Sequence, residues 1–152
     1  FAPAINYKYL NKWFEFNAPS PYMLFVSHIA KSKIVKNSTK EKSILKNINL
    51  VRSKVPAITH VDNSARVQTV EKNTNNYFYE LIEEFNKISK VPILVNTSFN
   101  VRGEPIVCSP QDAFKCLMGT DLDILVIENF FLEKKKQNKL LIKDYRDKFK
   151  LD

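Results

Sequence analysis

The sequence predicts an α/β (α+β) domain with a mixed sheet, because strand-like and helical patterns alternate along it. Apolar residues at helical spacing run from Asn76 to Ser89, and the continuous apolar run Val91–Val95 follows directly. Ser109-Pro110 then opens a second helix, with a hydroxyl cap and a proline at the first helical position. No fixed period repeats along the chain, which argues against a solenoid.

In the first of these helices, Glu80, Glu83 and Glu84 are expected to face outward, because the apolar residues share the spacing of one helical face. Those apolar residues are Phe78, Leu81, Ile82, Phe85 and Ile88. The run Val91–Val95 predicts a strand buried on both faces. The second helix is expected to stop at Gly119.

Near the start of the chain, Asn6 is expected to cap a short helix that Pro19 and Pro21 follow. Its apolar residues Leu10, Trp13 and Phe14 would share one face. Short apolar runs bounded by polar turns predict the remaining strands. These are Tyr22–Ile29, Ala57–Val61, Arg66–Val70, Ile124–Glu128 and Phe130–Glu133.

The expected organisation is one domain over residues 1–133, a Lys-rich insertion or long loop at 31–54, and a polar tail at 134–152. The insertion carries a net charge of +7 and residues 133–152 carry +4, which leaves −3 for the rest of the +8 total. Only four basic residues are arginines, whereas nucleic-acid readout relies on arginine forks. We therefore do not expect nucleic acid to be the main partner.

The two cysteines, Cys108 and Cys116, are expected to be small buried side chains, since their spacing suits neither a metal site nor a typical disulfide framework. With only two histidines besides, we expect no metal site in this chain. No apolar run has the length of a membrane span and no signal peptide opens the chain, so a cytoplasmic protein with no membrane partner is expected. Because Phe1 replaces the usual Met, we expect a processed chain or a fragment.

Glycine is scarce, with Gly103 and Gly119 alone, so neither a P-loop nor a dinucleotide fingerprint can be written here. Side chains must therefore make most contacts if the chain binds a nucleotide. The polar segment Asn96–Pro105 follows the buried-strand candidate, at the strand end where open sheets bind ligands. Its amide and hydroxyl donors suit phosphate oxygens. The alternative is a plain tight turn with Arg102 and Glu104 on the surface.

A second polar segment, Thr59–Val70, contains Arg66 at the start of a predicted strand. A guanidinium at that place can clamp two phosphate oxygens, and the alternative is a surface salt bridge with Asp62. His60 is the histidine nearest this chemistry, and both a structural and a catalytic role stay open for it. The order of the residues indicates no Ser-His-Asp or Cys-His arrangement.

An ordered series of segments extends these two motifs through the chain: Phe1-Ala2-Pro3-Ala4, Ser20–Met23, Pro56–Asp62, Ser64–Val70, Val91–Val107, Ser109-Pro110, Asp112-Ala113 and Leu125–Leu132. Together they resemble the C-terminal domain of the nodulation-type and antibiotic O-carbamoyltransferases. The resemblance covers nearly the whole chain except residues 31–54 and the tail.

The resemblance implies a two-domain enzyme. An upstream domain of the actin-like ATPase superfold, which would hold the metal of the transfer site, carries the carbamoyl group to an acceptor hydroxyl. The present segment resembles its YrdC-like partner domain, a twisted mixed sheet with flanking helices around a basic cavity. That domain uses ATP, with Mg, and carbamoyl phosphate to make carbamoyl adenylate.

By the same resemblance, Arg66 and Ser98 are the expected catalytic residues. Ser98 and Asn100 match a Ser-x-Asn pattern, and Arg66 matches a nucleotide-contacting arginine. The residues expected to bind ATP are His60, Asn96, Thr97, Asn100 and Arg102.

In the family, a basic K-x-R-E-x-F-R segment precedes the Phe-Ala-Pro and supplies the other half of the phosphate cradle. Residues 1–152 alone are therefore expected to be inactive. Two alternatives from other classes stay open: an RNA-binding YrdC-like module, and a non-catalytic scaffold domain.

Overall fold

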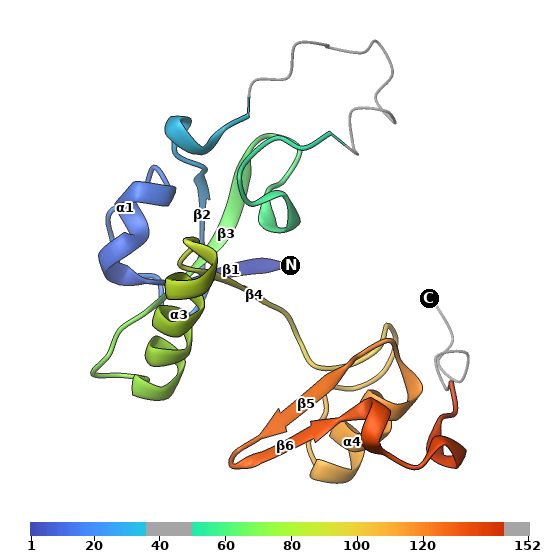
Figure 1. Cartoon of the computed structure of the whole chain (residues 1–152). Coiled ribbons are helices and arrows are strands. Elements are labelled where there is room, and N and C mark those ends of the chain that lie inside the picture. Colours follow the sequence, from blue (N-terminus) through green and yellow to red (C-terminus); the bar gives the residue numbers. More distant parts are fainter. Residues whose placement is uncertain (36–49, 145–152) are drawn as a thin grey trace. The chain divides into compact units, whose positions relative to one another are not determined.

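The computed structural model describes residues 1–35 and 50–144, which form two compact units, Phe1–Thr97 and Ser98–Asp152 (Figure 1). The first unit contains a four-stranded mixed sheet, and the second contains a two-stranded hairpin with one α-helix. This combination confirms the predicted α+β class.

Four strands build the sheet of the first unit: β1 (Ala2–Asn6), β2 (Phe25–His28), β3 (Ser64–Val70) and β4 (Ile93–Asn96). Their order is β2-β3-β1-β4. The pair β1–β3 is parallel, whereas β1–β4 and β2–β3 are antiparallel. The strand β1, which the sequence did not predict, is therefore central and buried along its whole length.

Helices cover both faces of this sheet. On one face, the 3-10 helix η1 (Tyr7–Tyr9) and the short helix α1 (Leu10–Trp13) lead into the buried Phe14, which belongs to the main hydrophobic cluster. On the other face, α3 (Asn76–Ser89) packs Ile82 against a smaller cluster. The bounds of α3 match the prediction because Asn75 caps its start and Lys90 ends it with a φ of 61°.

Three predictions about the strands of this unit are wrong. The predicted strand Ala57–Val61 is instead the 3-10 helix η3 (Pro56–Ile58) and a turn, because Pro56 fits the first helical position but cannot donate to a strand. The run Val91–Val95 is not buried on both faces: β4 is an edge strand, and Val95 is 50% exposed. The predicted strand at Tyr22 starts only at Phe25.

Asn6 caps no helix with its side chain, contrary to the prediction, because this side chain is buried and faces α3. Its Nδ2 donates to the backbone carbonyl of Tyr79 at 3.0 Å and to Oε1 of Glu83 at 2.6 Å. Glu83, predicted to face outward, also accepts from Lys8 Nζ at 2.8 Å and from Tyr9 Oη at 3.2 Å. This network ties α3 to the end of β1.

The network sets the protonation of its two charged members. Partial burial acts to raise the pKa of Glu83, but the hydrogen bonds from Lys8 and Asn6 and the Lys8 charge outweigh it, so this pKa lies below its usual value. The hydrogen bond to Glu83 is the main cause that raises the pKa of Lys8. Both groups are therefore charged over the whole neutral range.

Replacing Glu83 by Gln is expected to lower the free energy of unfolding at pH 7 by about 1–2 kcal/mol, the scale of hydrogen bonds to a charged group. A lowered folded-state pKa contributes stability above the unfolded value of about 4.3, and this contribution is lost as the pH falls through the folded-state value. The free energies of unfolding of the wild type and Glu83→Gln, measured in urea titrations, should therefore begin to converge below about pH 4 and coincide once the pH is below the folded-state pKa. Glu84→Gln, which removes an exposed partner of Lys87, should change the stability by less than about 0.5 kcal/mol. Equal effects of the two substitutions would contradict the prediction.

The second unit packs α4 (Pro110–Gly119) against the hairpin of β5 (Ile124–Ile127) and β6 (Phe130–Glu133). Ser109 caps α4 as predicted: its Oγ accepts from the Asp112 amide at 3.1 Å and donates to the Asp112 carboxylate at 2.6 Å. The helix also ends at Gly119 as predicted. Leu117 and Leu125 form the centre of the hydrophobic cluster between helix and hairpin.

Parts of the predicted insertion and tail are visible. Lys31–Lys33 forms the 3-10 helix η2, and Ile34 pairs with the buried Ser53, while the remaining insertion residues 36–49 lie outside the described residues. The tail begins with the 3-10 helices η4 (Lys134–Lys136) and η5 (Lys139–Leu141), and residues 145–152 are not described. In the part of the chain that the structure describes, no helix combines the length and the apolar character needed to cross a membrane.

Candidate functional site

Strand β3 places Arg66 on the face of the sheet opposite to the main cluster. The neighbouring Ala65 and Val67 are fully buried, whereas Arg66 is exposed, as the alternation along a strand requires. Helix α3 covers this face at the far end of β3, where Val70 packs with Ile82. Within residues 1–35 and 50–144, the guanidinium has no hydrogen-bond or ion-pair partner. A guanidinium has donors that suit an anion.

Two amide side chains share this face of the sheet. Asn96, at the end of β4, donates through Nδ2 to Oε1 of Gln68 at 2.5 Å, and Gln68 Nε2 donates to the Pro21 carbonyl at 3.1 Å. Strand β1 runs between them and presents Ala2 opposite Asn96 and Ala4 opposite Gln68. Because alanine is small, the two amides can meet across β1. This contact orients Asn96 at the carboxyl end of β4.

A cluster of polar side chains surrounds Ser64, the first residue of β3. The Ser64 Oγ lies 2.6 Å from Asp62 Oδ1 and 3.1 Å from His60 Nδ1. The Ser64 backbone amide also donates to Asp62 Oδ1, at 3.0 Å. These bonds, led by that of the Ser64 hydroxyl, hold the pKa of Asp62 below its usual value despite an opposing effect of burial. His28, which pairs with Ser64 across β2–β3, also favours the carboxylate.

The polar loop after β4 carries the other predicted residues. The Val107 amide donates to the Phe99 carbonyl at 2.9 Å and closes the loop at its base. Inside it, Asn100 Nδ2 donates to the carbonyls of Val101 and Glu104, at 3.0 and 2.9 Å. Both N–H donors of Asn100 are thus engaged within the loop, so a ligand would meet only its amide oxygen.

The remaining predicted residues lie around this loop and are exposed. Thr97 ends the first unit and Ser98 begins the second, so four predicted residues belong to one unit and three to the other. Ser98 and Arg102 have no hydrogen-bond or ion-pair partner among the described residues. Gly103 follows Arg102 with a φ of 81°, a conformation that suits glycine. The loop therefore offers a hydroxyl and a guanidinium to a ligand.

The sequence that forms this sheet and loop matches the model of one known family, described as carbamoyltransferase C-terminus, over residues 1–134. The chain belongs to this family. It is 43% identical to an uncharacterized protein of Synechocystis sp. over 155 residues, which cover all of this chain and 25% of that protein. The nodulation protein NolNO of Sinorhizobium fredii is 38% identical over 89% of this chain and 18% of its own length.

A third relative, the nodulation protein NolO of Bradyrhizobium diazoefficiens, is 49% identical over 52% of this chain and 14% of its own length. The chain thus spans a quarter or less of each of these relatives. The predicted resemblance to a carbamoyltransferase C-terminal domain is confirmed at the level of the family.

In this carbamoyltransferase domain, the sequence-based prediction of the site missed three polar residues that contact predicted ones directly or through a neighbour: Asp62 and Ser64 beside His60, and Gln68 beside Asn96. A signal for Gln68 was present, because it lies two residues after Arg66 and alternation puts both on one face. The contact between His60 and Ser64 depends on the turn at Asn63, whose φ is 64°. Asparagine tolerates this region, but its presence does not require that conformation.

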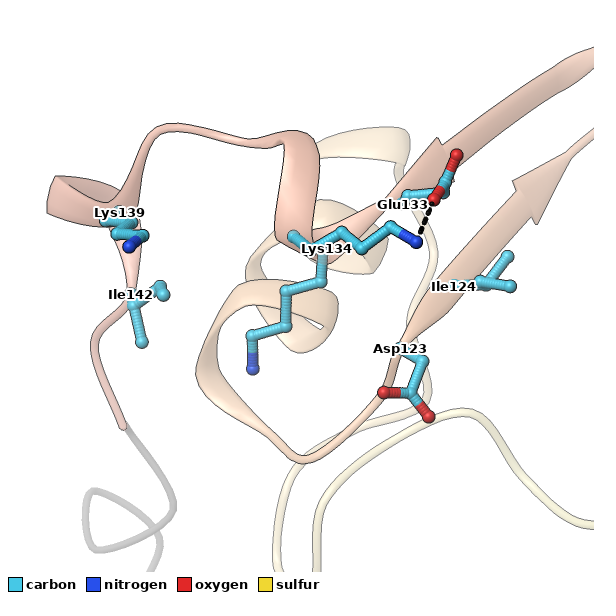
Figure 2. Close-up of a pocket in the computed structure, with 7 residues that line it drawn as sticks. Asp123, Ile124, Glu133, Lys134, Lys139 and Ile142 are labelled. Carbon is cyan, nitrogen blue, oxygen red and sulfur yellow. Dashed lines mark ion pairs between the residues drawn. The ribbon is translucent and has the colours of Figure 1, made fainter.

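Two hollows of the carbamoyltransferase domain lie inside the second unit, and their lining includes none of the predicted site residues. One, of about 670 Å³, lies between the start of β5 and the tail and is lined by Asp123, Glu133, Lys134, Lys139 and Ile142 among others (Figure 2). The other, of about 290 Å³, is apolar and lies between α4 and the hairpin. The open sheet face is instead a surface. Across the described ranges, no three His, Cys, Asp or Glu residues are grouped to hold a metal ion.

Proposed function

We propose that this chain is the nucleotide-handling part of an O-carbamoyltransferase, which binds ATP and carbamoyl phosphate and forms carbamoyl adenylate. An upstream domain of the same polypeptide, of the actin-like ATPase superfold and holding the metal of the transfer site, would pass the carbamoyl group to an acceptor hydroxyl. The family membership and the two nodulation relatives support the transferase class. The short span of the chain relative to these proteins leaves room for such a domain.

The observation that carries the proposal is the exposed, unpartnered guanidinium of Arg66 on an open polar face, within the part of the chain that the structure describes. Forming the adenylate joins a carbamate oxygen to the α-phosphorus of ATP and expels pyrophosphate. Carbamoyl phosphate and one water supply the carbamate and release phosphate. Negative charge moves among phosphate oxygens in this step, and a fixed arginine fork stabilises it without reorganising.

The other residues take roles that follow from their surroundings. Ser98 and Arg102, which lack partners among the described residues, would donate to phosphate oxygens, and Thr97 and Asn96 would bind at the end of β4. Asn100 would hold the loop in shape, because its donors are already engaged. The described residues offer no grouped carboxylates for Mg²⁺, so this ion would enter with the ATP phosphates as part of the substrate.

The full-length protein should catalyse exchange of labelled pyrophosphate into ATP, and this exchange should require carbamoyl phosphate. Residues 1–152 alone should fold but show no exchange, because the family's upstream basic segment would supply the rest of the phosphate cradle. Circular dichroism of the isolated chain provides the control for folding. Exchange that does not depend on carbamoyl phosphate, or robust exchange by residues 1–152 alone, would contradict the proposed function or the place of the site.

A further inference from the structure

Three side chains at the start of β3 form a hydrogen-bonded chain, and only one of them, His60, is among the residues expected to bind ATP. Asp62 Oδ1 lies 2.6 Å from Ser64 Oγ, and Ser64 Oγ lies 3.1 Å from His60 Nδ1. Ser64 is 3% exposed, so its hydroxyl has little access to water, whereas His60 is exposed. The other ring nitrogen, His60 Nε2, has no partner among the described residues.

The positions of the protons in this chain follow from the donors and acceptors available. An ionised aspartate carries no proton, so the 2.6 Å contact requires the Ser64 hydroxyl to donate to Asp62. That hydroxyl has one hydrogen, and it can then only accept at its contact with His60. His60 must therefore donate through Nδ1–H, and in the neutral ring Nε2 carries the lone pair. The hydrogen bonds between Asp62 and Ser64 would be enough to hold this turn, so the turn alone does not explain why the His60 ring also contacts the Ser64 hydroxyl.

The chain lies on the same open face as Arg66. Ser64 and Arg66 are two residues apart on β3, which puts them roughly 7 Å apart on one side of the strand. His28 on β2 pairs with Ser64 in the β2–β3 ladder, and Arg66 lies two residues further along β3, so both residues lie near the start of β3 together with Asp62.

We propose that Asp62 and Ser64 are positioning residues that hold His60 in the Nδ1–H form, so that Nε2 takes up a proton and donates to a phosphoryl anion held by Arg66. The anion part of this inference rests on the proposed function. The tautomer part does not. Proton uptake would add a second charged donor to the Arg66 site, and the Asp62 carboxylate would compensate the new charge through Ser64.

Nitrogen NMR of the imidazole side chains tests the tautomer in residues 1–152 without any ligand. The chain has two histidines, so His28→Gln leaves only the His60 signals. Neutral His60 should show a protonated Nδ1 and an unprotonated Nε2. Ser64→Ala should remove this preference. Asp62→Asn should keep it, because the Ser64 amide, 3.0 Å from Oδ1 in the wild type, still requires an oxygen at that place.

Sulfate is the probe for the anion, because its charge does not change over the range in which histidine titrates. Its affinity should rise about tenfold from near pH 7.5 to near pH 5.5, the scale of one charge-assisted hydrogen bond, and His60 Nε2 should shift on binding. Ser64→Ala and Asp62→Asn should each reduce this rise to about twofold or less. Arg66→Gln should weaken sulfate binding at both pH values.

Each outcome decides a separate point. A wild-type His60 with protonated Nε2 in the neutral ring, or an unchanged tautomer in Ser64→Ala, overturns the positioning role. Sulfate binding that requires Arg66 but leaves the His60 signals unmoved overturns the inference and leaves the proposed function standing. Absence of any Arg66-dependent binding of sulfate or pyrophosphate by the full-length protein, which includes the upstream basic segment, counts against both.

Discussion

Arg66→Gln is expected to lower carbamoyl adenylate formation by the full-length protein about 100-fold or more, the scale of one lost charge-stabilising donor group. The side chain is exposed and has no partner among the described residues, so its loss should change the free energy of unfolding by less than about 0.5 kcal/mol. Arg66→Lys should recover little activity, because a point charge cannot replace two parallel N–H donors. Carbamoyl-phosphate-dependent pyrophosphate exchange measures the effect.

A matched control removes a different guanidinium. Arg52 lies outside the predicted site and donates to the Leu50 carbonyl at 3.2 Å, so Arg52→Gln should leave the exchange rate within about twofold. Supplying chemically made carbamoyl adenylate should restore acceptor carbamoylation to Arg66→Gln. If this variant stays inactive with the adenylate, its defect lies in transfer or folding. If Arg66→Gln catalysed pyrophosphate exchange at the normal rate, Arg66 would be a surface residue with no role in binding phosphate.

The elements predicted correctly are those with a local signal. Helices α3 and α4 have the predicted bounds because their cap residues and spacing act within a few positions. Strand β1 was missed because Ala2–Asn6 contains Ala, Pro and Asn, which are poor strand formers. Its strand conformation comes from β3 and β4, which pair with it from residues more than sixty positions away. Pro3 fits because the parallel ladder with β3 begins only at Ala4.

The helical spacing of α3 also did not show which of its residues face the sheet. Ile82 is buried as predicted, yet Leu81 and Ile88 are 56% and 85% exposed, while Glu83 faces inward. A periodic apolar stripe predicts which face of a helix is buried. In α3, however, the buried Asn6 and the nearby Lys8 both donate to Glu83, so this glutamate also faces the sheet. Sequence periodicity alone does not contain these partners.

For the candidate site, the sequence predicted which residues could bind a ligand, but it did not predict which of them already have hydrogen-bond partners within the protein. Arg66 and the loop after β4 stood out by composition, and the structure leaves Arg66, Ser98 and Arg102 without partners among the described residues. Whether the Asn100 amide is free depends on the positions of the Val101 and Glu104 carbonyls in a loop in which Gly103 has a positive φ. A prediction of donors for phosphate could not foresee that this one is already used.

Asn100→Ala is therefore expected to act through the loop. It removes two hydrogen bonds at once, each contributing about 1 kcal/mol, so the loop should open roughly 30-fold more often. The amides of Val101, Glu104 and Val107, which bond to Glu104 Oε2, the Val101 carbonyl and the Phe99 carbonyl, should lose hydrogen-exchange protection by that factor. In the full-length protein, adenylate formation should fall about 100-fold, because the proposed donors to phosphate lie on this loop.

Ser98→Ala provides the matched comparison. It removes a hydroxyl that has no partner among the described residues, so adenylate formation should fall about 100-fold while the exchange protection of the three loop amides stays the same. Asn100→Asp should behave like Asn100→Ala or worse, since a carboxylate cannot donate and would face two carbonyl oxygens. If Asn100→Ala instead lost activity with its loop amides fully protected, Asn100 would have to contact the ligand directly. Either its free amide oxygen would then accept from the ligand, or its donors would have to leave Val101 and Glu104 when ATP binds.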